Sequence, residues 1–133
     1  MEIKKYKFQS HGDNRGQLIA IEECKDIPFD IKRVYYMYDT VNETIRGKHA
    51  HKSLEQILIC TSGSCKILLD DGKNKKIVEL NKPYEGIYIS NAIWREMYDF
   101  SRDAVLMVLA SNYYDESDYI RDYNEFLLYV GNK

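Results

Sequence analysis

Two of the three histidines in this 133-residue chain are separated by a single residue, in the stretch Arg46-Gly47-Lys48-His49-Ala50-His51-Lys52. Successive side chains of a β-strand point to opposite faces, so His49 and His51 are expected to share one face. Imidazole is a common metal ligand, and it also gains and loses protons near neutral pH. The pair therefore suits either half of a metal site or a site of proton transfer.

The metal interpretation depends on a third ligand. Glu55 follows His51 closely, and sites made of two histidines and one carboxylate are known. His11 lies far upstream, and no histidine follows His51. The spacing leaves a metal centre open, but the lack of a further histidine weakens it.

Proton transfer is the alternative. An isomerisation needs a base that removes a proton beside a carbonyl and an acid that returns one to the neighbouring carbon. Arg46 and Lys48 would place positive charge next to an enediolate or an acidic substrate. An isolated pair of this kind is also compatible with two solvent-facing side chains, so the motif needs its structural context.

Short β-strands are the elements expected to position the pair. Apolar and β-branched runs alternate with turn residues at 18–21, 31–38, 57–60, 66–69, 77–80, 86–89, 94–98 and 104–110. Many short strands of even spacing, separated by turns, are typical of antiparallel sandwiches and barrels. Residues 1–112 are therefore predicted to form a small all-β barrel or jelly roll.

The end of the chain has a different period. In residues 113–130, apolar and aromatic side chains recur every three or four residues among acidic ones, namely Tyr119, Ile120, Tyr123, Phe126, Leu127 and Val130. This period predicts one amphipathic α-helix with acidic residues in its first turns. We expect one domain over residues 1–133, a β-barrel that carries a single C-terminal helix.

Composition limits the classes of function. Hydrophobic residues make up 44% and charged residues 30% of the chain, which are ordinary values for a globular protein. Lys and Arg number 19 against 21 Asp and Glu, so no excess of positive charge favours nucleic acid or a membrane surface. No apolar leader or membrane-length segment is visible, so a cytoplasmic protein is expected.

Blocks along nearly the whole chain resemble the nucleotide-linked sugar 3,4-ketoisomerases of the cupin (RmlC-like) fold. They include Asp13-Asn14-Arg15-Gly16, the segment 27–36, Arg46–Lys52, Trp94-Arg95-Glu96-Met97 and Asp118-Tyr119-Ile120-Arg121. Together, the histidine block and the block at 118–121 make this resemblance specific.

The resemblance implies a reaction and its partners. Family members convert dTDP-4-keto-6-deoxy-D-glucose into the 3-keto isomer without metal or organic cofactor. A pyridoxal-phosphate aminotransferase then adds a 3-amino group, and the sugar enters surface glycans such as lipopolysaccharide O-antigens. The family is typically a homodimer that exchanges N-terminal strands between subunits.

The resemblance also implies roles for individual residues. His49 corresponds to the base that moves a proton between C3 and C4 of the sugar. His51 is its partner, either a second acid/base or the group that orients His49. Tyr35 would donate to the ketone or enediolate oxygen, and Arg46 would bind the negatively charged substrate. Ordinary structural hydrogen bonds are the alternative for Tyr35 and Arg46.

Two arginines are expected to influence the configuration at C4. Arg15, in the 13–16 turn, favours the galacto product, whereas Arg95, just after the tryptophan, favours the gluco product. The sequence therefore predicts either epimer or a mixture. A sugar-nucleotide 3- or 5-epimerase, or a metal- or ligand-binding cupin without turnover, is the competing function.

Overall fold

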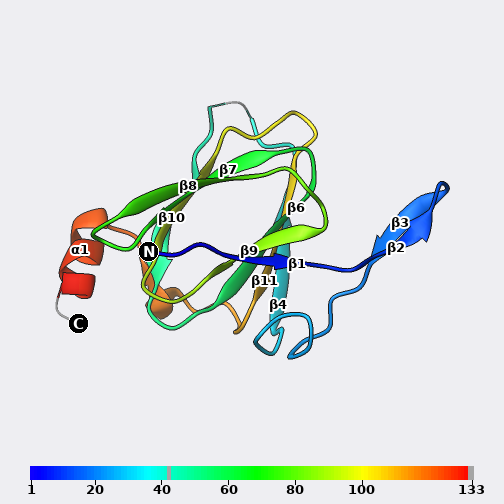
Figure 1. The fold of residues 1–133 in the computed structure, drawn as a ribbon. Coiled ribbons are helices and arrows are strands. Elements are labelled where there is room, and N and C mark those ends of the chain that lie inside the picture. The colour runs from blue at the N-terminus through cyan, green and yellow to red at the C-terminus, as the bar shows by residue number, and fades with distance from the viewer. Residues whose placement is uncertain (42, 132–133) are drawn as a thin grey trace.

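Two five-stranded antiparallel sheets form the body of the protein (Figure 1). The computed structural model describes residues 1–41 and 43–131. The first sheet has the order β1 (Lys4–Lys7), β9 (Glu85–Ile89), β6 (Gln56–Ser62), β11 (Val105–Ala110) and β4 (Arg33–Met37). The second has the order β12 (Tyr119–Ile120), β5 (Arg46–His51), β10 (Trp94–Tyr98), β7 (Cys65–Asp70) and β8 (Lys75–Leu80). The predicted all-β class is confirmed.

The main core lies between the two sheets. Leu58 of β6 and Leu106 of β11 meet Ile67 of β7 and Met97 of β10 in one buried cluster. β6 and β11 also bury their other face, because a second cluster that includes Phe29 covers it. This double burial explains why residues 57–60 of β6 are all apolar instead of alternating with polar residues.

The predicted helix at 113–130 is wrong in its first half. Residues 116–118 form a 3-10 turn capped by Asp115, β12 then pairs with β5, and α1 begins only at Tyr123 and ends at Gly131. The side chain of Asp122 accepts a hydrogen bond from the backbone of Glu125, so this acidic residue caps the helix instead of lying inside it. Phe126 seats α1 against Trp94, with ring centroids 5.8 Å apart.

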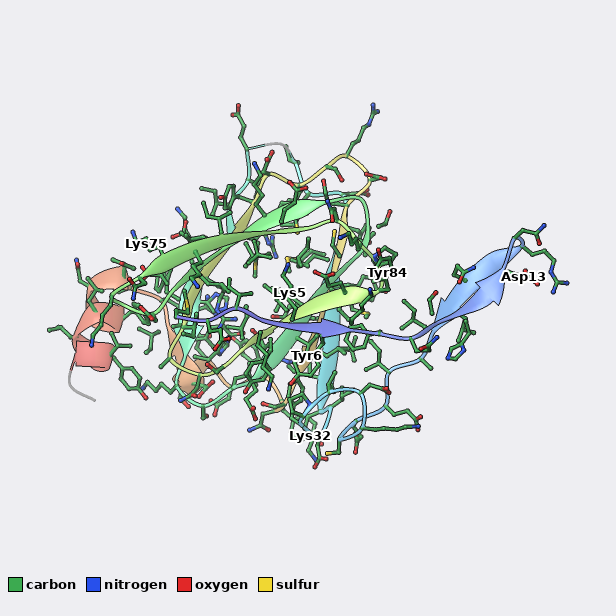
Figure 2. All side chains as sticks on the ribbon, in the orientation of Figure 1. Lys5, Tyr6, Asp13, Lys32, Lys75 and Tyr84 are labelled. Atoms are coloured by element: carbon green, nitrogen blue, oxygen red, sulfur yellow. The ribbon has the colours of Figure 1, made fainter. Side chains whose placement is uncertain are left out.

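A separate hairpin is formed by β2 (Ser10–Asp13) and β3 (Gly16–Ile19). It projects from the body at the end opposite α1, and Asp13 lies at its tip (Figures 1 and 2). The turn expected over 13–16 is tight, because β2 ends at Asp13, β3 begins at Gly16, and only two residues separate the strands. Leu18 is 61% exposed there.

Within the part of the chain that the structure describes, none of the helices has the length and apolar character needed to cross a membrane.

Candidate active site

His49 and His51 lie side by side on β5, as their spacing predicted. Their ring centroids are 4.8 Å apart in an edge-on arrangement. His49 is 8% exposed and His51 is fully buried, so the alternative of two solvent-facing histidines is excluded. β5 lies between β10 and β12 in the sheet. In the backbone register, His49 lies opposite Arg95 of β10, and His51 lies opposite Tyr119 of β12.

A β-bulge just before His49 sets the direction of its side chain. Gly47 and Lys48 have φ angles of 84° and 55°, and the register with β10 shifts at this point. A Cβ atom on Gly47 would lie 3.0 Å from the backbone oxygen of Arg95, so glycine is required here. The bulge leaves Lys48 exposed, whereas His49 next to it is buried.

Asp118 fixes His51 from behind. Its Oδ2 atom lies 3.2 Å from Nδ1 of His51, and its carboxylate also accepts hydrogen bonds from the backbone of Ser53 and Leu54. A carboxylate accepts but does not donate, so the hydrogen of the neutral imidazole lies on Nδ1. Asp118 therefore orients the ring and selects its tautomer.

Tyr119 forms the aromatic side of the site. Its ring centroid lies 4.9 Å from that of His49 and 4.3 Å from that of His51. The guanidinium of Arg121 lies 4.2 Å from the Tyr119 ring, and Nε of Arg121 binds Glu116 at 2.6 Å. This segment thus brings a cation and an aromatic wall to the histidines.

A buried chain of polar groups connects Arg95 to Tyr35. Nη1 of Arg95 donates to Oε1 of Gln56, and Nε2 of Gln56 donates to the hydroxyl of Tyr35 at 2.9 Å. The guanidinium of Arg95 also binds the backbone oxygen of Ile93. Arg95 is thus a fully buried cation adjacent to the histidines.

Both histidines are neutral at physiological pH. Burial, followed by the charge of Arg95, lowers the pKa of His49 to about 4. The same two causes, followed by His49, lower the pKa of His51 to about 2, so burial outweighs the attraction of Asp118. Both ring nitrogens of His49 and Nε2 of His51 are buried without a hydrogen-bond partner among the described residues. Such groups are available to a bound substrate.

A cavity of about 490 Å³ gives access to His49. Tyr35, Tyr119 and three arginines, Arg33, Arg46 and Arg121, line it. A smaller cavity of about 170 Å³ is lined by His51 and Asp118. The larger space combines a neutral base, a phenol and several positive charges, which suits an anionic substrate with a carbonyl group.

The predicted site residues occupy three different places. His49, Tyr35 and Arg46 line the larger cavity, and His51 lies beside them. Arg95 is completely buried behind this wall. Arg15 is exposed and binds Asp13, which lies at the tip of the projecting hairpin (Figure 2).

Sequence reasoning missed several residues of the site. Arg33 lies 5.1 Å from the Tyr35 ring and lines both cavities. Asp118, Tyr119 and Arg121 belong to a block that the family resemblance had already singled out. The assignment of this block to a helix hid the pairing of Tyr119 and Ile120 with β5, and only the strand signal of β12 would have revealed it.

The donor set is a poor match for a resident metal. Glu55, the candidate third ligand, instead accepts a hydrogen bond from the hydroxyl of Tyr88. Among residues 1–41 and 43–131, no group of three or more His, Cys, Asp or Glu side chains is arranged to hold a metal ion.

Comparison with known proteins places this site in a family. Residues 1–131 match the FdtA family, described as WxcM-like, C-terminal. TDP-4-oxo-6-deoxy-alpha-D-glucose-3,4-oxoisomerase from Aneurinibacillus thermoaerophilus is 55% identical, over 98% of this chain and 94% of that relative.

Solved structures agree with this relationship. A 3,4-ketoisomerase from Helicobacter canadensis is 54% identical with a TM-score of 0.95, over 98% of both chains. A histidine-to-asparagine mutant of the 3,4-ketoisomerase from Thermoanaerobacterium thermosaccharolyticum, in complex with TDP-4-keto-6-deoxyglucose, is 47% identical with a TM-score of 0.96. That match covers 98% of this chain and 95% of the other. The chain therefore belongs to the FdtA, WxcM-like family of TDP-sugar 3,4-ketoisomerases.

Proposed function

We propose that this enzyme converts dTDP-4-keto-6-deoxy-D-glucose into a dTDP-3-keto-6-deoxyhexose. The observation that carries the proposal is the neutral imidazole of His49, whose ring nitrogens have no hydrogen-bond partner in the described part of the chain and which lines a cavity together with Tyr35. The names of two relatives, 55% and 47% identical, support the choice of substrate, since one includes this sugar and the other was solved in complex with it.

The reaction exchanges the oxidation levels of C3 and C4 without an external oxidant. A base removes the hydrogen on C3, which is acidic because C4 is a ketone, and an enediolate forms. A proton then returns to C4, while the hydroxyl proton on O3 leaves and O4 gains one. The atoms balance, and only protons move.

His49 is assigned the transfer of the proton from C3 to C4 of the sugar. Its neutral ring has an open lone pair, which takes the proton from C3, and the resulting imidazolium returns it to C4. His51, held by Asp118, supports His49 through the contact between their rings. Whether His51 also exchanges a proton with the substrate is an alternative that the two single variants would separate.

Tyr35 and the arginines are assigned to stabilise the negative charges of the enediolate and of the nucleotide. The hydroxyl of Tyr35 donates to the oxygen that becomes negative in the enediolate. Arg46, together with Arg33 and Arg121, lines the cavity and suits the diphosphate of the nucleotide. Arg15 and Arg95 stay assigned to substrate recognition and to the face of C4 that is protonated, with galacto, gluco or both as products.

A homodimer with exchanged N-terminal strands is part of the proposal. The β2–β3 hairpin extends away from the body and exposes Leu18, which would be buried against a second copy (Figure 1). Such an exchange would carry Arg15 toward the partner's site. Strand β4 also exposes Val34 and Tyr36 at the edge of its sheet, where a second subunit would cover them.

The 3-keto product is a substrate for a pyridoxal-phosphate aminotransferase, which would make a 3-amino sugar for surface glycans such as O-antigens. We expect the reaction to take place in the cytoplasm and to need no cofactor.

The proposal is tested by incubating the enzyme with dTDP-4-keto-6-deoxyglucose and trapping the labile product with a 3-aminotransferase. NMR of the aminated sugar would give the position of the amino group and the configuration at C4. An epimerase would leave the carbonyl at C4 and invert a neighbouring centre. Binding without any conversion would instead favour a ligand-binding cupin, and stoichiometric metal in the purified protein would favour a metal site.

A further inference from the structure

Gln56 lies beneath the cavity and connects two functional groups. Its side-chain oxygen accepts a hydrogen bond from Arg95, and its side-chain nitrogen donates to the Tyr35 hydroxyl at 2.9 Å. Gln56 is 1% exposed and Arg95 is fully buried, so bulk water does not compete for these bonds.

The chemistry of the three groups fixes the direction of both bonds. A guanidinium can only donate, so the amide oxygen of Gln56 must face Arg95. The amide nitrogen, which is only a donor, then faces Tyr35 and occupies a lone pair of its oxygen. Among the described residues the Tyr35 hydroxyl has no other hydrogen bond, and Tyr35 lines the same cavity as His49. The phenolic hydrogen is therefore left for a group in the cavity.

We infer that Gln56 is a positioning residue that holds the Tyr35 hydroxyl with its hydrogen directed at the reacting oxygen of the substrate. This inference rests on the proposed ketoisomerase function and adds a donor of fixed direction to it. A donor that is oriented before the reaction stabilises a developing oxyanion without reorganising. The Arg95 cation polarises the amide, and this makes the phenol a stronger donor.

The replacement Gln56→Glu tests the direction of the bond. A carboxylate has nearly the same shape and keeps Arg95 as its partner, but it presents an acceptor to Tyr35 in place of a donor. The phenolic hydrogen would then turn away from the substrate. We expect kcat to fall on the order of 10²-fold, as for the loss of one oxyanion donor, with little change in KM.

The double variant separates positioning from a general structural role. If Gln56→Glu acts through the Tyr35 hydrogen, adding it to Tyr35→Phe should cost nothing further in kcat. Multiplied losses would overturn the inference, as would a Gln56→Glu enzyme with at least half of the wild-type kcat. Normal kcat in Tyr35→Phe would also overturn it, because no donor would then need positioning.

Two controls keep the result decisive. Thermal unfolding and TDP binding report whether each variant is folded, and Gln56→Met replaces Gln56→Glu in the same cycle if the carboxylate prevents folding. Gln56→Met should reduce kcat when Tyr35 is present. It should cause no further loss of kcat in the enzyme that already carries Tyr35→Phe. Failure of the wild type to convert the 4-keto sugar would refute the proposed function, whereas normal turnover by both Gln56 variants would refute only this inference.

Discussion

Oδ2 of Asp118 lies 3.2 Å from Nδ1 of His51, and this contact joins the C-terminal segment to the histidine strand. The same carboxylate accepts hydrogen bonds from Ser53 and Leu54, which hold it in place. His51 therefore has one available tautomer, with its hydrogen on Nδ1 and its lone pair on Nε2. The orientation of His51 thus depends on a residue that lies 67 positions away in the chain.

Asp118→Asn should lower kcat on the order of 10²-fold, because the amide nitrogen can donate to Nδ1 and favour the wrong tautomer. TDP affinity should change little, since Asp118 lies behind His51 and does not line the larger cavity. Steady-state kinetics and TDP titration measure the two effects. Asp122→Asn is the matched control, because Asn also caps helices well. Equal kcat in the two variants would contradict the orienting role of Asp118.

His49→Asn should remove the proton shuttle and lower kcat by about 10²- to 10⁴-fold, the usual contribution of general acid–base catalysis. Asparagine fits the space and cannot take up a proton, so folding and TDP binding should survive. The exposed Lys52, three residues along the chain, offers a control, and Lys52→Ala should turn over at nearly the wild-type rate. Near-normal turnover by His49→Asn would move the role of base to His51.

Mild acid should destabilise the folded protein, because buried His49 binds a proton less readily in the folded state than in the unfolded state. In the unfolded chain the pKa of His49 returns from about 4 to about 6.5, so the unfolded state binds more protons between these values. The stability that this pKa difference contributes to the folded state is fully present above pH 6.5 and is lost as the pH falls toward 4. For His49 it amounts to on the order of 3 kcal/mol.

Urea unfolding at pH 7.5, 6 and 5 measures this loss, and His49→Asn should show a weaker dependence on pH than the wild type. The low pKa of His49 also predicts that kcat/KM stays flat down to about pH 5.5 and falls only near pH 4. An acid limb near pH 6.5 would show that the base has an unperturbed pKa.

Strand exchange predicts that two variants with different damaged residues can restore each other. If the hairpin carries Arg15 into the partner's site, Arg15→Ala and His49→Asn damage the same site from different subunits. Mixed dimers of the two would then contain one intact site and one doubly damaged site. At a substrate concentration too low for Arg15→Ala alone to turn over, co-refolding equal amounts should recover about a quarter of wild-type activity, because half of the dimers are mixed and each of these has one intact site. Recovery of no activity would place Arg15 and His49 in the same subunit's site or show that no exchange occurs.

The strands around the core were predicted from short apolar runs that are separated by turn residues. The shared face of His49 and His51 was predicted because the backbone itself sets a period of two in a strand. The first half of the C-terminal segment was wrongly predicted as a helix, because Tyr119, Ile120 and Tyr123 also fit a helical period. Their actual state was decided by partners far away, since Asp118 binds the turn after β5 and Ile120 pairs with Ala50.

The sequence by itself determined the all-β class, the family and the pair of histidines, because these depend on local spacing and on blocks of neighbouring residues. Tertiary structure alone decided the surroundings of the pair. It buried both rings, which lowers their pKa values, and it brought Asp118 from the 3-10 turn against His51 and the charge of Arg95 from β10 close to both rings. It also placed Gln56 between Arg95 and Tyr35. Burial, tautomer and the direction of a hydrogen bond depend on groups that only folding brings together.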